Sequence, residues 1–170
     1  MKSGTSAAAL GILLLWGGGT ASGASQYHRE SLRGLAGVAP RVERIAPDAQ
    51  QYGLDEMSIY TDVEQRLGKA GIKALTAGQL SQEPGSPVLY IRVNAKQSYD
   101  APVYAVNVTV ALLQDAVAAR DSNLKLREVK TWDAGYMRTY APDNLAQARS
   151  VVSDLVDEFI RDWIAANSKK

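Results

Sequence analysis

The sequence predicts an α+β two-layer sandwich, an antiparallel sheet of four to five strands with two helices on one face. Segments 88–95 and 103–113 alternate apolar and polar side chains, which is typical of strands with one buried and one wet face. Segments 55–70 and 143–167 repeat apolar side chains every three to four residues, as helices covering an apolar surface do. The predicted order is β-α-β-β-β-β-α, with a run of strands between the helices.

The last of these segments, 143–167, has the widest apolar stripe. Its members are Leu145, Ala148, Val152, Leu155, Val156, Phe159, Ile160, Trp163 and Ile164. Burying nine such side chains contributes on the order of 10–20 kcal/mol before entropy is subtracted. Pro142 precedes the segment, and Asp143 is expected to cap it. We therefore expect this helix to cover the sheet, with Phe159 and Trp163 buried.

The remaining elements follow from local signals. Segment 35–45 is expected to be the first strand, and Pro40 confines it to an edge or a bulge. The helix over 55–70 is expected to be capped by Asp55 and to stop at Gly71 in a Schellman motif. Two further strands and the connections complete the chain: strands at 73–75 and 126–132, and loops at 46–53, 76–87, 96–102 and 133–142.

The first 24 residues are typical of a secretory signal peptide. A basic Lys2 precedes an apolar run over 7–16, and small residues lead to cleavage before Ser25. The alternative is a retained membrane anchor, but the run breaks at Gly17 and is shorter than the ~20 residues that a span needs.

The expected division is a signal peptide at 1–24, a polar leader at 25–34 and a single α+β domain at 35–170. This predicts a periplasmic or secreted protein without an integral membrane span after cleavage.

Charge and cysteine content exclude several classes of function. The net charge is +1, and Lys2 is the only charged residue among the first 24, so the remainder has 18 basic and 18 acidic side chains. This balance gives no long-range attraction to nucleic acid. The absence of cysteine excludes disulfides, thiol nucleophiles, zinc–thiolate sites and a cysteine-linked lipid.

No motif for catalysis or a cofactor is present. The single histidine, His28, lies in the polar leader, and no G-x-S-x-G, phosphate-binding or EF-hand pattern occurs. Four acids lie within about two turns of the last helix: Asp154, Asp157, Glu158 and Asp162. They could bind a hard cation, but Arg149 and Arg161 beside them favour a solvated face. We expect no metal, no cofactor and no enzymatic activity.

The candidate binding residues are five aromatic side chains and an arginine, which fall on connections at neighbouring strand ends: Tyr99, Tyr104, Trp132, Tyr136, Arg138 and Tyr140. They either form a peptide- or glycan-binding patch or fill the open end of the sandwich and stack on the sheet. A partner strand could also add to the edge that contains Pro40, unless this proline guards the edge against pairing.

Several segments together resemble a family of small exported bacterial proteins of unassigned activity. They are YGLDEMSIYTDVEQRLGKAGIKAL (52–75), PGSPVLYIRVNA (84–95), YAVNVTVALLQ (104–114), KTWDAG (130–135) and DLVDEFIRDW (154–163). At the level of fold the chain is similar to periplasmic accessory domains, including the activators of cell-wall synthases. Those activators are usually lipoproteins, and this chain lacks the cysteine that such anchorage needs.

These observations favour a non-enzymatic exported binding or accessory domain for a protein or cell-envelope component. One alternative is a carboxylate-dependent hydrolase acting on envelope polymer, which predicts a cleft with two carboxylates about 5–10 Å apart. Another is a structural subunit of an envelope assembly, which predicts an apolar patch on the outer sheet face.

Overall fold

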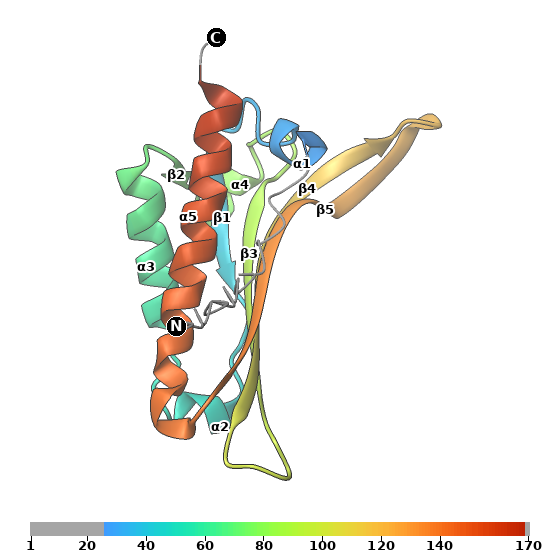
Figure 1. Cartoon of the computed structure of the whole chain (residues 1–170). Helices are drawn as coiled ribbons and strands as arrows, with labels where there is room; N and C mark the ends of the chain where they lie inside the picture. Colours follow the sequence, from blue (N-terminus) through green and yellow to red (C-terminus); the bar gives the residue numbers. More distant parts are fainter. Residues whose placement is uncertain (1–25, 169–170) are drawn as a thin grey trace, which may run out of the picture.

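The structure, a computed structural model, describes residues 26–168, so the expected signal peptide lies outside the described residues. It is an α+β fold with a five-stranded sheet and its two long helices on one face (Figure 1). The elements in order are α1 (Gln26–Glu30), β1 (Gly37–Val42), α2 (Pro47–Gln50), α3 (Glu56–Lys69), β2 (Lys73–Ala74), α4 (Ala77–Leu80), β3 (Val88–Gln97), β4 (Tyr104–Ala118), β5 (Asp121–Tyr140), the 3-10 helix η1 (Pro142–Gln147) and α5 (Ala148–Asn167). The predicted α+β sandwich is therefore confirmed.

The sheet is mixed rather than wholly antiparallel. Its order is β2-β1-β3-β4-β5. Strands β3, β4 and β5 form the expected antiparallel meander, but β1 pairs in parallel with both β2 and β3. The cause is that helices lie in both connections, α3 between β1 and β2 and α4 between β2 and β3, and a crossover of this kind returns the chain to the end of the sheet where the previous strand began.

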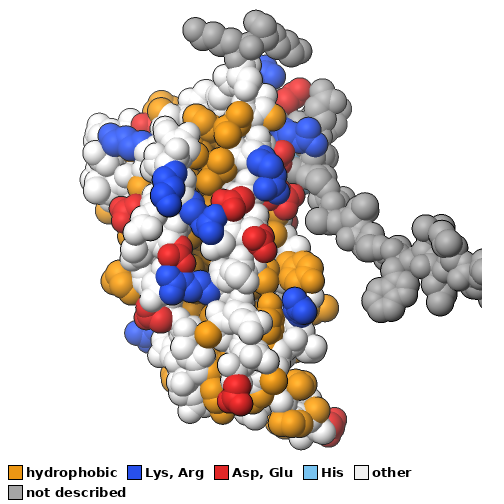
Figure 2. All heavy atoms as spheres, turned by 60° about the vertical axis from the view of Figure 1, so that its left-hand side comes forward, with side chains coloured by type: hydrophobic (Ala, Val, Ile, Leu, Met, Phe, Trp, Pro, Cys, Tyr) orange, Lys and Arg blue, Asp and Glu red, His pale blue; other side chains and the backbone are white. Residues whose placement is uncertain are grey.

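Helix α5 lies over the sheet as its stripe predicts, except that Ile164 at the end of the stripe is 48% exposed and not buried as expected. Phe159 is fully buried, and Trp163 is partly buried and donates its indole N–H to the carbonyl oxygen of Leu35 at 2.9 Å. Helix α3 packs beside α5, and two ion pairs cross the seam between them: Arg149–Asp62 and Arg66–Asp157. Figure 2 shows this helical side of the molecule, where basic and acidic side chains are interspersed.

Helix α3 begins and ends as the sequence predicts, but the last helix does not begin as predicted. Asp55 accepts a hydrogen bond from the backbone N–H of Ser58 at 2.7 Å. Gly71 has φ +78°, and the N–H of Ile72 reaches the carbonyl of Leu67 at 2.9 Å, which completes the Schellman motif. For the last helix the predicted N-cap, Asp143, is wrong. Asp143 lies inside the 3-10 helix η1, which starts at Pro142, so it does not cap α5.

Pro40 lies in β1, an interior strand of the sheet, but at a point where one side of β1 has no neighbouring strand within residues 26–168. Strand β2 pairs only with Gly37 and Val38 of β1, so it ends before it reaches Pro40. On the other side Pro40 pairs with Leu89 of β3. A missing N–H is therefore tolerated at this point of the sheet, and β1 is not the outer strand that the sequence suggested for β-augmentation.

Strand β5 is much longer than the seven residues predicted. It takes in the expected loop at 133–142 as far as Tyr140 and begins five residues earlier, at Asp121. Together with β4 it extends past the end of β3 as a two-stranded projection, seen at the upper right of Figure 1. We call residues 114–129 of this projection the arm.

The residues expected to form a polar leader pack against the domain. Residues 26–30 form α1, and Leu32 after it is fully buried. The side chain of Asn167 at the end of α5 donates to the carbonyl of Leu32 at 3.0 Å and accepts from the N–H of Gly34 at 2.7 Å. Among the described residues no helix combines the length and the apolar character needed to cross a membrane.

Candidate functional site

Three of the six predicted binding residues line one groove between β5 and α5. The groove has a volume of about 310 Å³. We call it the β5–α5 groove, and its lining residues are Tyr136, Arg138, Tyr140, Gln147, Ser150, Val151, Asp154, Leu155, Glu158 and Arg161.

The strand side of the groove follows from sheet register. Tyr136, Arg138 and Tyr140 are alternate residues of β5, and their partners on β4 include the buried Val108 and Val106. Directly opposite residues of an antiparallel pair share one face of the sheet. All three side chains therefore stand on the face that carries α5.

The three strand residues differ in how far they are exposed. Tyr136 is 48% exposed and offers an aromatic ring to solvent. Arg138 is also exposed, and its guanidinium carbon lies 5.7 Å from the ring centroid of Tyr140, a cation–π contact. Tyr140 itself is buried. The groove thus combines one accessible ring with a guanidinium held over a second ring.

Two other predicted residues lie in the core instead. Trp132 is 0% exposed, packs edge-on against Phe159 with ring centroids 5.2 Å apart, and donates its indole N–H to Asp162 at 3.0 Å. Tyr104 is buried against Tyr52, and burial raises the pKa of its hydroxyl. For these two, filling the sandwich is the interpretation that the structure supports.

The sixth predicted residue is separate from the groove. Tyr99 is 93% exposed in the loop between β3 and β4 and does not line the β5–α5 groove. The predicted cluster is therefore divided among the groove, the core and a loop.

The helix side of the groove was missed by the sequence analysis. Its α5 residues Val151, Asp154, Glu158 and Arg161 are spaced by three, four and three, so they follow one face beside the apolar stripe. That spacing is visible in the sequence and could have identified this face. Two acids, Asp154 and Glu158, are balanced by two arginines, Arg138 and Arg161, so the charged side chains of the groove sum to zero.

Beside the groove runs a strand edge. Among the described residues β5 pairs with β4 alone and is the outermost strand of the sheet. Residues 135–139 are exposed. An edge strand presents a row of backbone N–H and C=O groups that an added strand can satisfy. The arrangement can therefore hold an extended chain by its backbone while the groove receives some of its side chains.

The acids of α5 do not gather into a metal site. Asp157 is paired with Arg66 at 2.7 Å, and Asp162 is paired with Arg29 at 3.2 Å. Within residues 26–168 no group of three or more potential ligands is placed to hold a metal ion. The solvated-face interpretation fits, although the partners of these two acids are Arg66 and Arg29 rather than the arginines expected.

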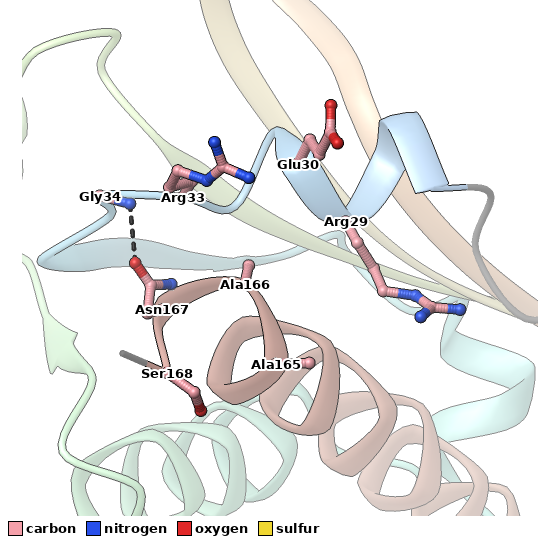
Figure 3. A pocket seen from close by; sticks show the side chains of 8 residues that line it. All are labelled: Arg29, Glu30, Arg33, Gly34, Ala165, Ala166, Asn167 and Ser168. Carbon is pink, nitrogen blue, oxygen red and sulfur yellow. Dashed lines mark hydrogen bonds between the residues drawn. The ribbon is translucent and has the colours of Figure 1, made fainter. Parts of the chain in front are cut away.

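A larger cavity of about 830 Å³ lies at the other end of α5 (Figure 3). Arg29, Glu30 and Arg33 lie on one side of it, and the last turn of α5 with Ala166 and Asn167 lies on the other. Arginines near a helix C-terminus offset its partial negative charge. We interpret this region as the place where α5 holds the N-terminal segment, through the Asn167 contacts described above.

The outer face of the sheet carries an ion cluster. Glu43 accepts hydrogen bonds from the Tyr90 hydroxyl and from Arg92, which lower the pKa of this carboxyl. Arg41 pairs with Glu128 at 3.0 Å. This part of the described outer face is polar, and it differs from the continuous apolar patch that a structural subunit was expected to have.

Comparison with known proteins finds a distant likeness in structure and none in sequence. No family model and no curated protein matches the sequence. Among solved structures the chain is similar to a dodecamer of a PelC point variant from Paraburkholderia phytofirmans, with a TM-score of 0.41 and 20% identity over 75% of this chain and 87% of that one. A likeness at this distance assigns no function, and the predicted resemblance to small exported proteins stays a prediction.

Proposed function

We propose that this protein is an exported, non-enzymatic binding domain that holds an extended segment of a partner protein along β5. The observation that supports the proposal is the β5–α5 groove, in which an accessible tyrosine and two arginines stand beside a strand edge. The partner segment would add as a strand to residues 133–140 and direct alternate side chains into the groove.

The chemistry of the groove favours a peptide over a highly charged polymer. Its two acids and two arginines sum to zero, so it attracts neither polyanions nor polycations. The contacts with Tyr136 and Val151 suit an apolar or aromatic side chain, and the strand edge supplies hydrogen bonds that do not depend on sequence. A glycan could use the tyrosine but not the strand edge.

The test is selection of displayed random peptides against the purified protein and against groove variants. We expect selected peptides to lose at least tenfold in affinity with Tyr136→Ala and with Arg138→Ala. Met137→Ala is the matched control, because Met137 lies on the same strand but on its opposite face and is exposed. Peptides that bind the variants and the control alike would contradict the proposal, and binding of oligosaccharides alone would assign the groove to a glycan.

A second candidate function rests on the two carboxylates in the same groove. Asp154 and Glu158 are four residues apart on α5, which corresponds to a rise of about 6 Å. This spacing places the two side chains on one face of the helix, so their carboxylates can come within the roughly 5–10 Å that carboxylate pairs of glycoside hydrolases span. A hydrolase would release soluble fragments from purified cell-wall polymer and would lose this activity in Asp154→Asn and in Glu158→Gln, whereas a binding domain would release none.

A further inference from the structure

A cavity of about 410 Å³ lies on the outer face of the sheet, the face away from α3 and α5 (Figure 1). Its volume is within the ~300–1,000 Å³ that sites for small molecules commonly have. We call it the outer-face cavity, and its lining residues are Arg41, Tyr90, Arg92, Thr109, Ala111, Leu113, Glu128 and Lys130. None of these residues lines the β5–α5 groove, so the two are separate places on the protein.

The register of the sheet explains why this face is hollowed. Ala111 of β4 is paired with Tyr90 of β3, and directly paired residues share a face. Two residues along, Thr109 is paired with Arg92 on one side and with Gly135 on the other. Short side chains on β4 therefore lie beside long ones on β3. The cavity has a floor of Thr109 and Ala111 and a wall of Tyr90 and Arg92.

This wall is held in place by its own contacts. The Tyr90 hydroxyl donates a hydrogen bond to Glu43, and Arg92 donates to the same carboxylate at 2.6 Å. The guanidinium carbons of Arg41 and Arg92 lie 5.5 and 5.6 Å from the centroid of the Tyr90 ring, which are cation–π contacts. Polar groups that are already fixed in the free protein lose less entropy when a ligand binds.

Each cation that lines the cavity has an acidic partner. The pairs are Arg41–Glu128 at 3.0 Å, Arg92–Glu43 at 2.6 Å and Lys130–Asp133 at 3.0 Å. These charges sum to zero, so they give no net attraction to an ion. They still offer many hydrogen bonds, because a guanidinium carries five N–H donors and a carboxylate has two acceptor oxygens. Such a surface is complementary to a ligand that is uncharged and rich in hydroxyl groups.

The backbone beneath the cavity favours a saccharide over a peptide. Strands β3 and β4 are interior strands, and where they line the cavity they are paired on both sides. An extended peptide would therefore gain no main-chain ladder here, in contrast to the edge of β5. A saccharide does not need one, because its hydroxyl groups bond to side chains and its ring can lie against a tyrosine.

We infer that the outer-face cavity binds a neutral saccharide. The floor of Thr109 and Ala111 receives a sugar ring, and Arg41, Arg92 and Glu128, which lies at the base of the arm, bond to its hydroxyl groups. This site shares no residue with the β5–α5 groove and does not depend on the peptide proposed there. The protein then has a peptide site at the edge of its sheet and a saccharide site on the outer face.

The test is isothermal titration calorimetry with protein purified after expression of the full chain. The probes are cellotetraose, chitotetraose and maltotetraose, with tetragalacturonate as a charged counterpart, at concentrations up to about 10 mM. We expect at least one neutral probe to bind. Thr109→Tyr fills the floor with a ring and should weaken this binding at least tenfold.

Ala105→Tyr is the matched control for Thr109→Tyr. It introduces the same side chain on the same strand and face, at an exposed position outside the cavity, so it should leave the affinity unchanged. Tyrosine suits a strand, so both variants should fold. Arg92→Met carries the test if Thr109→Tyr does not fold. It removes the guanidinium donors and keeps an unbranched side chain, and it should weaken binding at least fivefold.

Four outcomes overturn the inference. The first is that no neutral probe binds, and the second is that tetragalacturonate binds more tightly than every neutral probe. The third is that Ala105→Tyr weakens binding as much as Thr109→Tyr does. The fourth is that the groove variant Tyr136→Ala abolishes binding while Thr109→Tyr and Arg92→Met keep it, which would place the saccharide in the β5–α5 groove.

Discussion

Trp132→Phe is expected to destabilise the domain by about 3 kcal/mol, because Trp132 is a core residue. The substitution removes the indole donor from Asp162, which keeps Arg29 at 3.2 Å and is only 16% exposed. A lost hydrogen bond to a charged group costs about 1.5–3 kcal/mol, and the smaller ring gives up roughly 1 kcal/mol of burial against Phe159. The total is a sizeable share of the ~5–15 kcal/mol that stabilises a typical domain.

The measurement is urea unfolding followed by tryptophan fluorescence and circular dichroism. With a urea dependence of about 2 kcal/mol per molar, the midpoint should fall by roughly 1.5 M. Tyr136→Phe is the matched control, because Tyr136 lies on the same strand and face but is half exposed, and it should change stability by less than ~0.5 kcal/mol. A midpoint for Trp132→Phe equal to that of the control would refute the assignment of Trp132 to the core.

Two further predictions concern the strand and helix contacts around the sheet. Gly37→Ala should lower the stability of the fold by about 2 kcal/mol or more in thermal unfolding, because an added Cβ would lie 2.5 Å from the carbonyl oxygen of Lys73, where β1 meets β2. Gly68→Ala is the matched control. Gly68 lies in open space on α3, so this substitution should raise the stability by roughly 0.5–1 kcal/mol. The hydrogen bond from Arg149 lowers the pKa of Asp62, so this pair stabilises the fold above the ordinary aspartate pKa of about 4 and loses its contribution as the pH falls through the lowered value. Arg149→Met should therefore cost roughly 0.5–1 kcal/mol at pH 7, since both side chains are partly exposed, and the difference from the unaltered protein should shrink toward pH 3 in urea titrations.

The sequence predicted the structure best in segments where a regular spacing of apolar residues coincides with burial, and at helix ends with clear capping residues. The apolar stripe of α5 identified Phe159 as buried and Trp163 as partly buried against the core, because a helix with one apolar face packs with that face inward. Asp55 and Gly71 identified the ends of α3, because capping needs particular side chains and backbone angles. These features depend on residues close together in the chain, so a local sequence pattern is enough to predict them.

The extent of β5 could not be predicted in the same way. Residues 132–140 alternate as a strand should, but the inward positions are occupied by Arg138 and two tyrosines as well as apolar residues, and Gly135 interrupts the outward row. The inward face of β5 tolerates Arg138 because this side chain lines the β5–α5 groove at the edge of the sheet. The groove exists only because of where α5 lies, and the local sequence does not give that position. For the same reason the sequence could not separate Trp132 from Tyr136, since the side-chain types are alike and only the tertiary position differs.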